Sequence, residues 1–205
     1  MEQFSFIFTI FLMLLGPFKL IPSFSALTQG MDGEFKRSIA IRGAAIASVL
    51  CAIVALAGDT ILRKYHVSID ALRISGGLIL LIAALKVIFQ KTPAPNPSSG
   101  AATAIQLAAS PVAVPSIVPP AGIAAILIFT MLAPQYPGMG QAVAICLAAV
   151  MLLDFLVMYF IDQIVRAPGL TIILTVLGAI LIFVQACLAI ETVLVALKNL
   201  GLFRA

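Results

Sequence analysis

The chain has 205 residues, of which 62% are hydrophobic and only 10% are charged. Because a typical globular domain is ~45–50% apolar and ~25% charged, this composition excludes a soluble domain and predicts a protein that crosses a membrane several times. The net charge of +4 is small and dispersed along the chain, which excludes nucleic acid as a partner.

The sequence contains six apolar segments, each long enough for a helix to cross the ~30 Å hydrocarbon core of a bilayer. One stretch, residues 91–103, is linker-like, because KTPAPNPSSG is polar and rich in proline and serine. This linker divides the chain into a first half, residues 1–90, and a second half, residues 104–205. The segments are 4–29, 38–62 and 70–89 in the first half, and 104–131, 140–165 and 170–197 in the second.

The first segment carries the stretch LGPFKLIP, in which Pro17 and Pro22 lie five residues apart. The fourth segment carries PVAVPSIVPPAG, in which Pro115 and Pro120 repeat this spacing about 98 residues later. A proline lacks the backbone N–H and its ring clashes with the carbonyl four residues earlier. Unpaired backbone groups are costly in lipid, so both segments are predicted to be broken, with the breaks lining a shared cavity.

Broken helices at matching places in two halves are typical of the binding site of a transporter. The predicted ion-coupling residue is Asp154, the deepest carboxylate. The predicted substrate site consists of residues at the two breaks: Gly16, Pro17, Lys19, Pro22, Pro115, Pro119, Pro120 and Gly122.

The two halves resemble each other in a second place. DTILR, from Asp59 to Arg63, closes the second segment, and DQIVR, from Asp162 to Arg166, closes the fifth. Within each motif the acid and the base are spaced for an ion pair on one helix face. Since each half has three segments, the second copy must be inverted in the membrane. We therefore predict an all-α membrane protein of six transmembrane helices, arranged as two inverted three-helix repeats with broken first and fourth helices.

Lys19 and Asp154 are ionisable residues far inside apolar segments. A cation near mid-span costs roughly 2.5–3.5 kcal/mol on insertion scales, so Lys19 is expected to face a ligand, to pair with Asp154, or to extend toward an interface. Asp154 lies twelve residues before Arg166. It is expected to carry protons, to pair with Lys19, or to face a wet crevice.

The pattern resembles the MarC family of membrane proteins, whose relatives include proteins described as neutral amino acid transporters. The resemblance covers nearly the whole chain and rests on RSIAIR (37–42), GDTIL (58–62), RISGG (73–77), the proline frame of both breaks, and Leu177-Gly178 with Glu191. It implies six spans in two inverted halves and an N-terminus outside. The family pattern at the first break has polar residues where this chain has Gly16 and Leu20, and a glycine at the position of Lys19.

The functional prediction is secondary transport of a small polar solute, an amino acid or a small anion, by alternating access. The alternatives are a lipid translocator and a non-transporting accessory subunit. No nucleophile and base pair, metal-ligand cluster or phosphate-binding loop is recognisable, so we expect no enzyme, no cofactor and no metal. The expected partners are membrane lipids and the solute, with a homo-oligomer as a further option. The expected location is the bacterial inner membrane; the absence of Lys and Arg before Phe4 favours an outside N-terminus.

Overall fold

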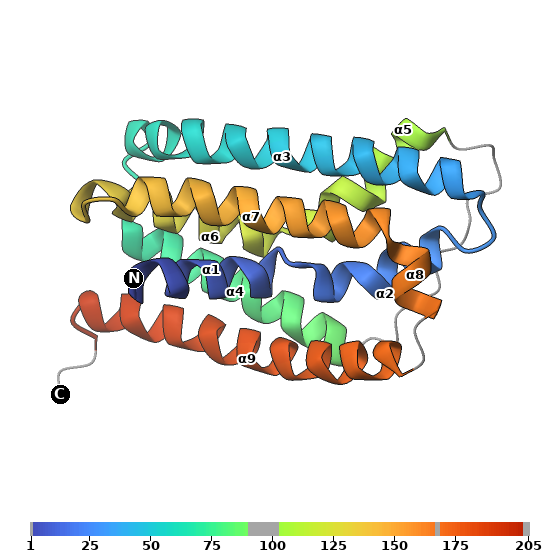
Figure 1. Cartoon of the computed structure of the whole chain (residues 1–205). Coiled ribbons are helices and arrows are strands. Elements are labelled where there is room, and N and C mark those ends of the chain that lie inside the picture. Colours follow the sequence, from blue (N-terminus) through green and yellow to red (C-terminus); the bar gives the residue numbers. More distant parts are fainter. Residues whose placement is uncertain (1, 90–102, 167–168, 203–205) are drawn as a thin grey trace.

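The computed structural model describes residues 2–89, 103–166 and 169–202, and every regular element in these ranges is helical. Most helices lie roughly along one direction (Figure 1). They are α1 (Glu2–Leu14), α2 (Pro17–Leu27), α3 (Gly33–Lys64), α4 (Ile69–Phe89), α5 (Ala104–Leu107), η1 (Ala108–Ile117), α6 (Pro120–Leu132), η2 (Ala133–Gln135), α7 (Met139–Tyr159), α8 (Ile161–Arg166) and α9 (Leu170–Asn199).

Four stretches are long and apolar enough to cross a membrane, judged by length and composition: Gln3–Leu27, Gly33–Lys64, Met139–Tyr159 and Val176–Asn199. Shorter apolar helices cover Ala104–Val114 and Pro120–Gln135. The prediction of an all-helical membrane protein is therefore confirmed.

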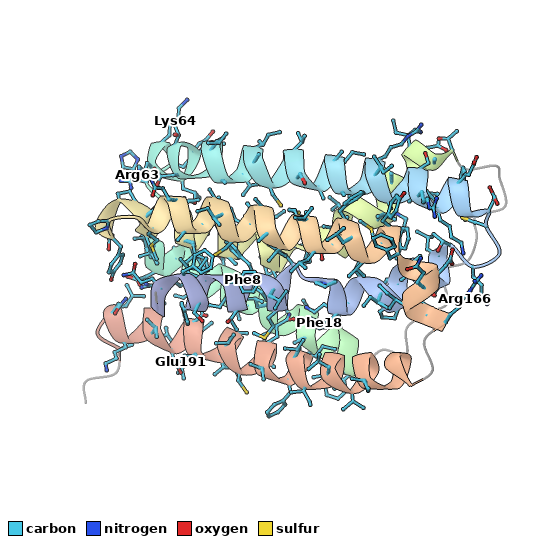
Figure 2. The ribbon with its side chains drawn as sticks, viewed as in Figure 1. Phe8, Phe18, Arg63, Lys64, Arg166 and Glu191 are labelled. Carbon is cyan, nitrogen blue, oxygen red and sulfur yellow. The ribbon has the colours of Figure 1, made fainter. Side chains whose placement is uncertain are left out.

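The bundle has two ends, here called the Gly33 end and the Lys64 end after the first and last residues of α3. The Gly33 end holds the ends of α2, α4 and α7, together with α5, α8 and the start of α9 (Figure 1). The Lys64 end holds the N-terminus, the starts of α4 and α7, and the end of α9. Charged side chains mark both ends, with Arg63 and Lys64 at one and Arg166 at the other (Figure 2).

Three packing relations organise the bundle. α4 packs along α9, while α3 packs against η1, α6 and α7, and α1 packs against α7. The first relation depends on Gly77, where an added Cβ would lie 2.6 Å from Cγ2 of Val193 and 2.8 Å from the carbonyl oxygen of Ala189. Small residues allow such close approach between membrane helices. The interior is apolar, with Ile7, Phe11 and Ile39 fully buried.

Ion pairs lie near the helix ends. Arg63 pairs with Asp59 at 2.8 Å, as the motif predicts. Asp162 instead pairs with Lys36 of α3 at 2.7 Å. The prediction of an Asp162–Arg166 pair is therefore wrong for Asp162, because α8 brings this carboxylate to α3. Exposed ion pairs contribute only about 0–1 kcal/mol to the stability of a protein. These pairs therefore add little to the stability of the bundle.

Labelling of single cysteines tests this arrangement, after replacement of Cys51, Cys146 and Cys187. We expect Gln29→Cys and Gln163→Cys to react with an impermeant maleimide from one face of the membrane, since both exposed positions flank the Gly33 end. Ser68→Cys and Gln135→Cys should react from the opposite face. Reaction of all four variants from one face would contradict the arrangement.

Candidate substrate and ion site

The first break is short. α1 ends at Leu14, and the N–H groups of Leu15 and Gly16 bond back to the carbonyls of Phe11 and Leu12 at 2.8 and 3.0 Å. Gly16 is extended, with φ −73° and ψ 172°, and α2 then begins at Pro17. A Cβ on Gly16 would lie 2.0 Å from the carbonyl oxygen of Leu12, so the backbone at this position accepts only glycine.

Pro22 does not contribute to the break, contrary to the prediction. It lies inside α2, and its side chain is exposed. Its missing N–H leaves the carbonyl of Phe18 without its usual helical donor, at a cost of roughly 3 kcal/mol. Further unwinding would leave more backbone groups unpaired, each at several kcal/mol in lipid, so the helix continues.

The second break is longer. η1 is an irregular helix of π type, with extended backbone at Ser110 and Val114 and a cis peptide bond between Ser110 and Pro111. Pro119 is extended as well, and α6 begins at Pro120. Pro119 is half-buried and Pro120 is exposed, whereas the side chain of Pro115 lies outside the described part of the chain.

The two breaks meet. A Cβ on Gly122, in the first turn of α6, would lie 2.4 Å from Cδ2 of Leu15 at the first break. Leu15 is 1% exposed, and Ile117 and Val118 are fully buried. Apolar side chains therefore fill the contact between the breaks, where the sequence predicts a cavity.

A double-mutant cycle tests this contact. Gly122→Ala should destabilise the protein by about 1–3 kcal/mol, because the new methyl group overpacks against Leu15. Leu15→Ala should cost about 2–5 kcal/mol through the space it leaves. In the double variant the methyl group has room, so the loss should be clearly smaller than the sum. Thermal unfolding in detergent measures all three; strict additivity would show that the two breaks do not touch.

Lys19 lies on α2 directly after the first break. Its ammonium donates a hydrogen bond to Oε1 of Gln185 on α9, a buried side chain that is 1% exposed. The Nε2 of Gln185 donates in turn to the carbonyl oxygen of Leu80 on α4, at 3.3 Å. Lys19 therefore does not pair with Asp154. Gln185 brings α2, α4 and α9 together at one polar point.

The surroundings of Lys19 are electropositive. Among the described residues no carboxylate forms an ion pair with it, and no backbone carbonyl accepts from the N–H groups of Phe18 and Lys19. These two N–H groups lie in the first turn of α2, which is the positive end of the helix dipole. We call the Lys19 ammonium, the Gln185 amide and this helix start the Lys19 cluster. A cation and free N–H donors together suit an anionic group.

Asp154 is the second polar feature of the interior. It is fully buried, and neither of its carboxylate oxygens has a hydrogen-bond partner among the described residues. An ionised carboxylate without a partner is costly inside a membrane. The Asp154 carboxylate must therefore bind a proton or another cation.

Asp154 lies nearer to the end of its helix than the sequence suggests. The fifth segment is not one straight helix, because α7 ends at Tyr159 and the chain turns at Phe160 into α8. Asp154 is five residues before Tyr159, which corresponds to about 7.5 Å of helix. Little more than one turn of helix therefore separates Asp154 from the end of α7 that points to the Gly33 end.

The interior thus offers a site for an anionic group at the Lys19 cluster and a site for a proton at Asp154. Sequence analysis identified both charged residues but missed Gln185, which fixes the Lys19 ammonium. The available signal was a polar amide within the apolar stretch 170–197, since polar groups inside the membrane face other helices and tend to be functional.

These features define an integral membrane protein with a helical bundle, interrupted helices and buried charges. Residues 1–200 match the family described as MarC family integral membrane proteins. The chain therefore belongs to the MarC family.

Curated relatives are similar over part or most of their length. The UPF0056 inner membrane protein YhgN of Escherichia coli K12 is 28% identical over 141 residues, 68% of this chain and 69% of the relative. Two UPF0056 membrane proteins of Buchnera aphidicola subsp. Schizaphis graminum are each 25% identical. One aligns over 189 residues, 91% of this chain and 88% of the relative; the other aligns over 121 residues, 59% of this chain and 60% of the relative. No solved structure matches the chain.

Proposed function

We propose that this protein is a secondary transporter of a small polar solute that carries an anionic group, such as an amino acid carboxylate or a small inorganic anion. The observation that carries the proposal is the Lys19 cluster. It places a part-buried cation at the positive end of α2 with no carboxylate counter-charge among the described residues. A bound anion would supply the missing charge, and the gain would be large because the surroundings exclude water.

The contacts between helices support an inverted repeat. α3 packs on α7, and α4 packs on α9, so each pair joins segments at the same position of the two halves. α1, which precedes the first break, packs on α7, and η1, which precedes the start of α6, packs on α3, so the roles of the two halves are exchanged. A pseudo-two-fold axis in the membrane plane would produce this pattern of contacts.

Alternating access would follow from rocking of one half against the other. The breaks meet at Leu15 and Gly122, and the extended backbone at the neighbouring Gly16 and Pro119 can absorb the change of angle as a hinge. Asp154 would carry the coupling proton, since its carboxylate is buried and lacks a partner among the described residues. Its short distance from the Gly33 end would allow proton exchange with that side.

We further propose the inner membrane as the location, as the name of the Escherichia coli relative states for that protein. With the N-terminus outside, the Gly33 end faces the cytoplasm. The basic residues are nearly balanced between the two ends, with Lys36, Arg37, Arg42, Lys86 and Arg166 at the Gly33 end and Arg63, Lys64, Arg73 and Lys198 at the other. The proposed orientation therefore rests on the absence of Lys and Arg before Phe4.

A proteoliposome screen tests the proposed function. Labelled neutral amino acids, small anions and headgroup-labelled lipids are presented with and without a pH gradient. We expect saturable uptake of an anion-bearing solute that increases when protons flow inward. The absence of uptake of any small solute would overturn the proposal. Movement of lipid alone would favour the lipid translocator, which a groove open to lipid between α3 and α7 also favours. If neither small solutes nor lipids are moved, the result would favour an accessory subunit.

A further inference from the structure

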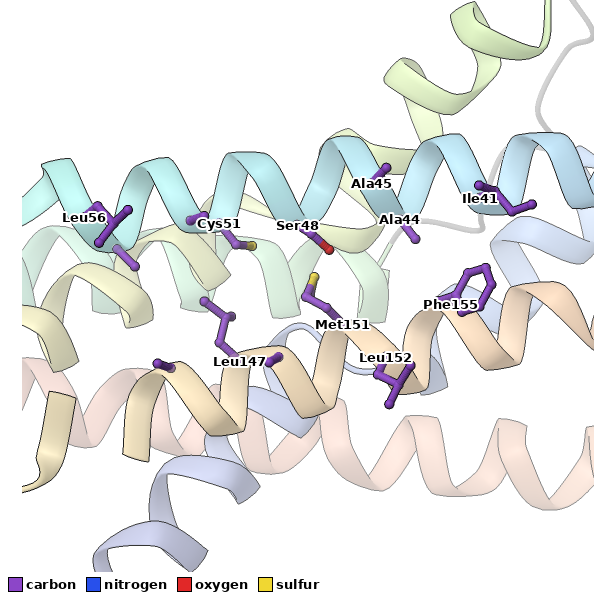
Figure 3. A pocket seen from close by; sticks show the side chains of 14 residues that line it. Ile41, Ala44, Ala45, Ser48, Cys51, Leu56, Leu147, Met151, Leu152 and Phe155 are labelled. Carbon is purple, nitrogen blue, oxygen red and sulfur yellow. The ribbon is translucent and has the colours of Figure 1, made fainter. Parts of the chain in front are cut away.

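A groove of about 610 Å³ runs between α3 and α7 on the surface of the bundle. Ile41 and Phe155 lie at one end of it, and Leu56 lies toward the other (Figure 3). From Ile41 to Leu56 the groove follows fifteen residues of α3, which is about 22 Å of helix. This length covers most of the ~30 Å hydrocarbon core.

The lining of the groove is almost entirely apolar. Short side chains form both walls, including Ala45 and Ser48 on α3 and Ala148 on α7, and they are exposed at the surface of the bundle. Leu147 and Met151 are buried beneath them. Because short side chains on facing helices do not fill the space between them, the groove stays open toward the lipid. Its occupant must therefore be long and apolar.

A cation lies at the Gly33 end of the groove. Arg37 is four residues before Ile41, and Tyr159 is four residues after Phe155, so each continues a helix face that lines the groove. The guanidinium carbon of Arg37 is 5.0 Å from the centroid of the Tyr159 ring. Tyrosines are enriched where a membrane protein meets the headgroups, which places this pair at headgroup level.

Arg37 is an available cation there, on the helix face that continues the groove, and the exposed Arg42 lies one residue beyond Ile41. The neighbouring Lys36 is neutralised by Asp162 at 2.7 Å. Arg37 is exposed, and among the described residues no carboxylate pairs with it. Its planar N–H groups suit the oxygens of a phosphate. The groove therefore combines a long apolar channel with a positive group at one end.

We propose that this groove binds an anionic phospholipid, with one acyl chain between α3 and α7 and its phosphate at Arg37. The apolar length selects a chain of membrane lipid over a soluble ligand. The unpaired guanidinium selects a lipid with net negative charge over a zwitterionic lipid, whose own cation competes for the phosphate. The proposal concerns a face of the bundle away from the Lys19 cluster and does not depend on transport.

The absence of tryptophan from the sequence allows a direct test. Phe155→Trp places a single fluorophore in the groove, and Phe183→Trp places one on the exposed surface of α9 as the control position. Each variant is reconstituted in vesicles of dioleoyl phosphatidylcholine that contain small fractions of phosphatidylglycerol or phosphatidylcholine with brominated chains. Bromine quenches only tryptophans that its chain contacts.

A basic residue near the membrane surface attracts an anionic lipid by about 1 kcal/mol. We therefore expect brominated phosphatidylglycerol to quench the Phe155→Trp variant to the same extent at about one-fifth of the lipid fraction that brominated phosphatidylcholine requires. The Phe183→Trp variant should not distinguish the two lipids.

In the Phe155→Trp background, Arg37→Gln should abolish the preference for phosphatidylglycerol, and Arg37→Lys should largely keep it. Lys64→Gln is the matched control, because it removes an exposed cation at the opposite end of the same helix (Figure 2). Ala148→Leu, which fills the groove, should weaken quenching by both lipids.

Three results would overturn the proposal. Equal quenching of the groove tryptophan by the two lipids would remove the anionic selectivity. A preference that survives in Arg37→Gln would place the phosphate elsewhere. A groove tryptophan that neither lipid quenches, in a protein that cross-links as a dimer, would show that a second copy covers the groove. Thermal unfolding of each variant excludes misfolding as the cause.

Discussion

Lys19→Met is expected to lower uptake of an anion-bearing solute by about 10- to 100-fold while the protein still inserts and folds. The ammonium donates to Gln185 and has no other described partner. Hydrogen bonds to charged groups contribute about 1.5–3 kcal/mol, and each 1.4 kcal/mol is about a factor of ten. The measurement is initial uptake into proteoliposomes at matched protein density. Lys86→Met, which removes an exposed cation near the end of α4, is the control.

Gln185→Glu should impair uptake as strongly as the loss of Lys19. It keeps the size of the side chain but places a carboxylate beside the ammonium, so an internal ion pair competes with the solute. Lys19→Arg should retain part of the activity because the positive charge remains. Normal uptake by both Lys19→Met and Gln185→Glu would reduce the Lys19 cluster to a structural contact.

The second large effect is expected at Asp154. Asp154→Asn should abolish stimulation by an inward proton gradient, because the amide cannot accept and release a proton in the working pH range. Exchange of solute without net proton movement should continue. Asp162→Asn is the matched control, since it removes an exposed carboxylate in the first turn of α8 that pairs with Lys36. Equal loss of stimulation in both variants would argue against a specific role for Asp154.

The same residue should also separate function from stability. Both carboxylate oxygens of Asp154 are buried without a described partner, and an unsatisfied buried polar group costs about 1–3 kcal/mol. Asp154→Leu should therefore raise the thermal unfolding temperature while removing proton stimulation. A destabilised Asp154→Leu protein would indicate that the carboxylate has a structural partner.

Composition and proline chemistry predicted much of the fold. The apolar segments indicate spanning helices because their length matches the bilayer. Pro17 marks the first break because its missing N–H suits the first position of a new helix. Pro22 misled the prediction, since a missing N–H inside a packed helix does not require unwinding. The end of α7 at Tyr159 was missed because Val165 and its neighbours are apolar enough to continue the pattern.

The candidate site was less predictable, because its contacts join residues far apart in the sequence. Lys19 and Gln185 are separated by 166 positions, and no local pattern pairs them. The packing of Leu15 on Gly122 likewise depends on how the halves meet. The small residue Gly43 in the second segment allows close packing, because a Cβ there would lie 2.8 Å from Cγ1 of Val112. Ala45 and Ser48, in the same segment, line an open groove instead.

Counterflow in proteoliposomes tests alternating access most directly. Vesicles are loaded with unlabelled solute, either phosphate or alanine, and diluted into a trace of the labelled form. A carrier that exposes one site alternately to each side should concentrate the label transiently above its equilibrium level, and Lys19→Met should abolish this overshoot. If the label only reaches its equilibrium level, whether or not the vesicles are preloaded, and if Lys19→Met behaves in the same way, the result would contradict alternating access at this site.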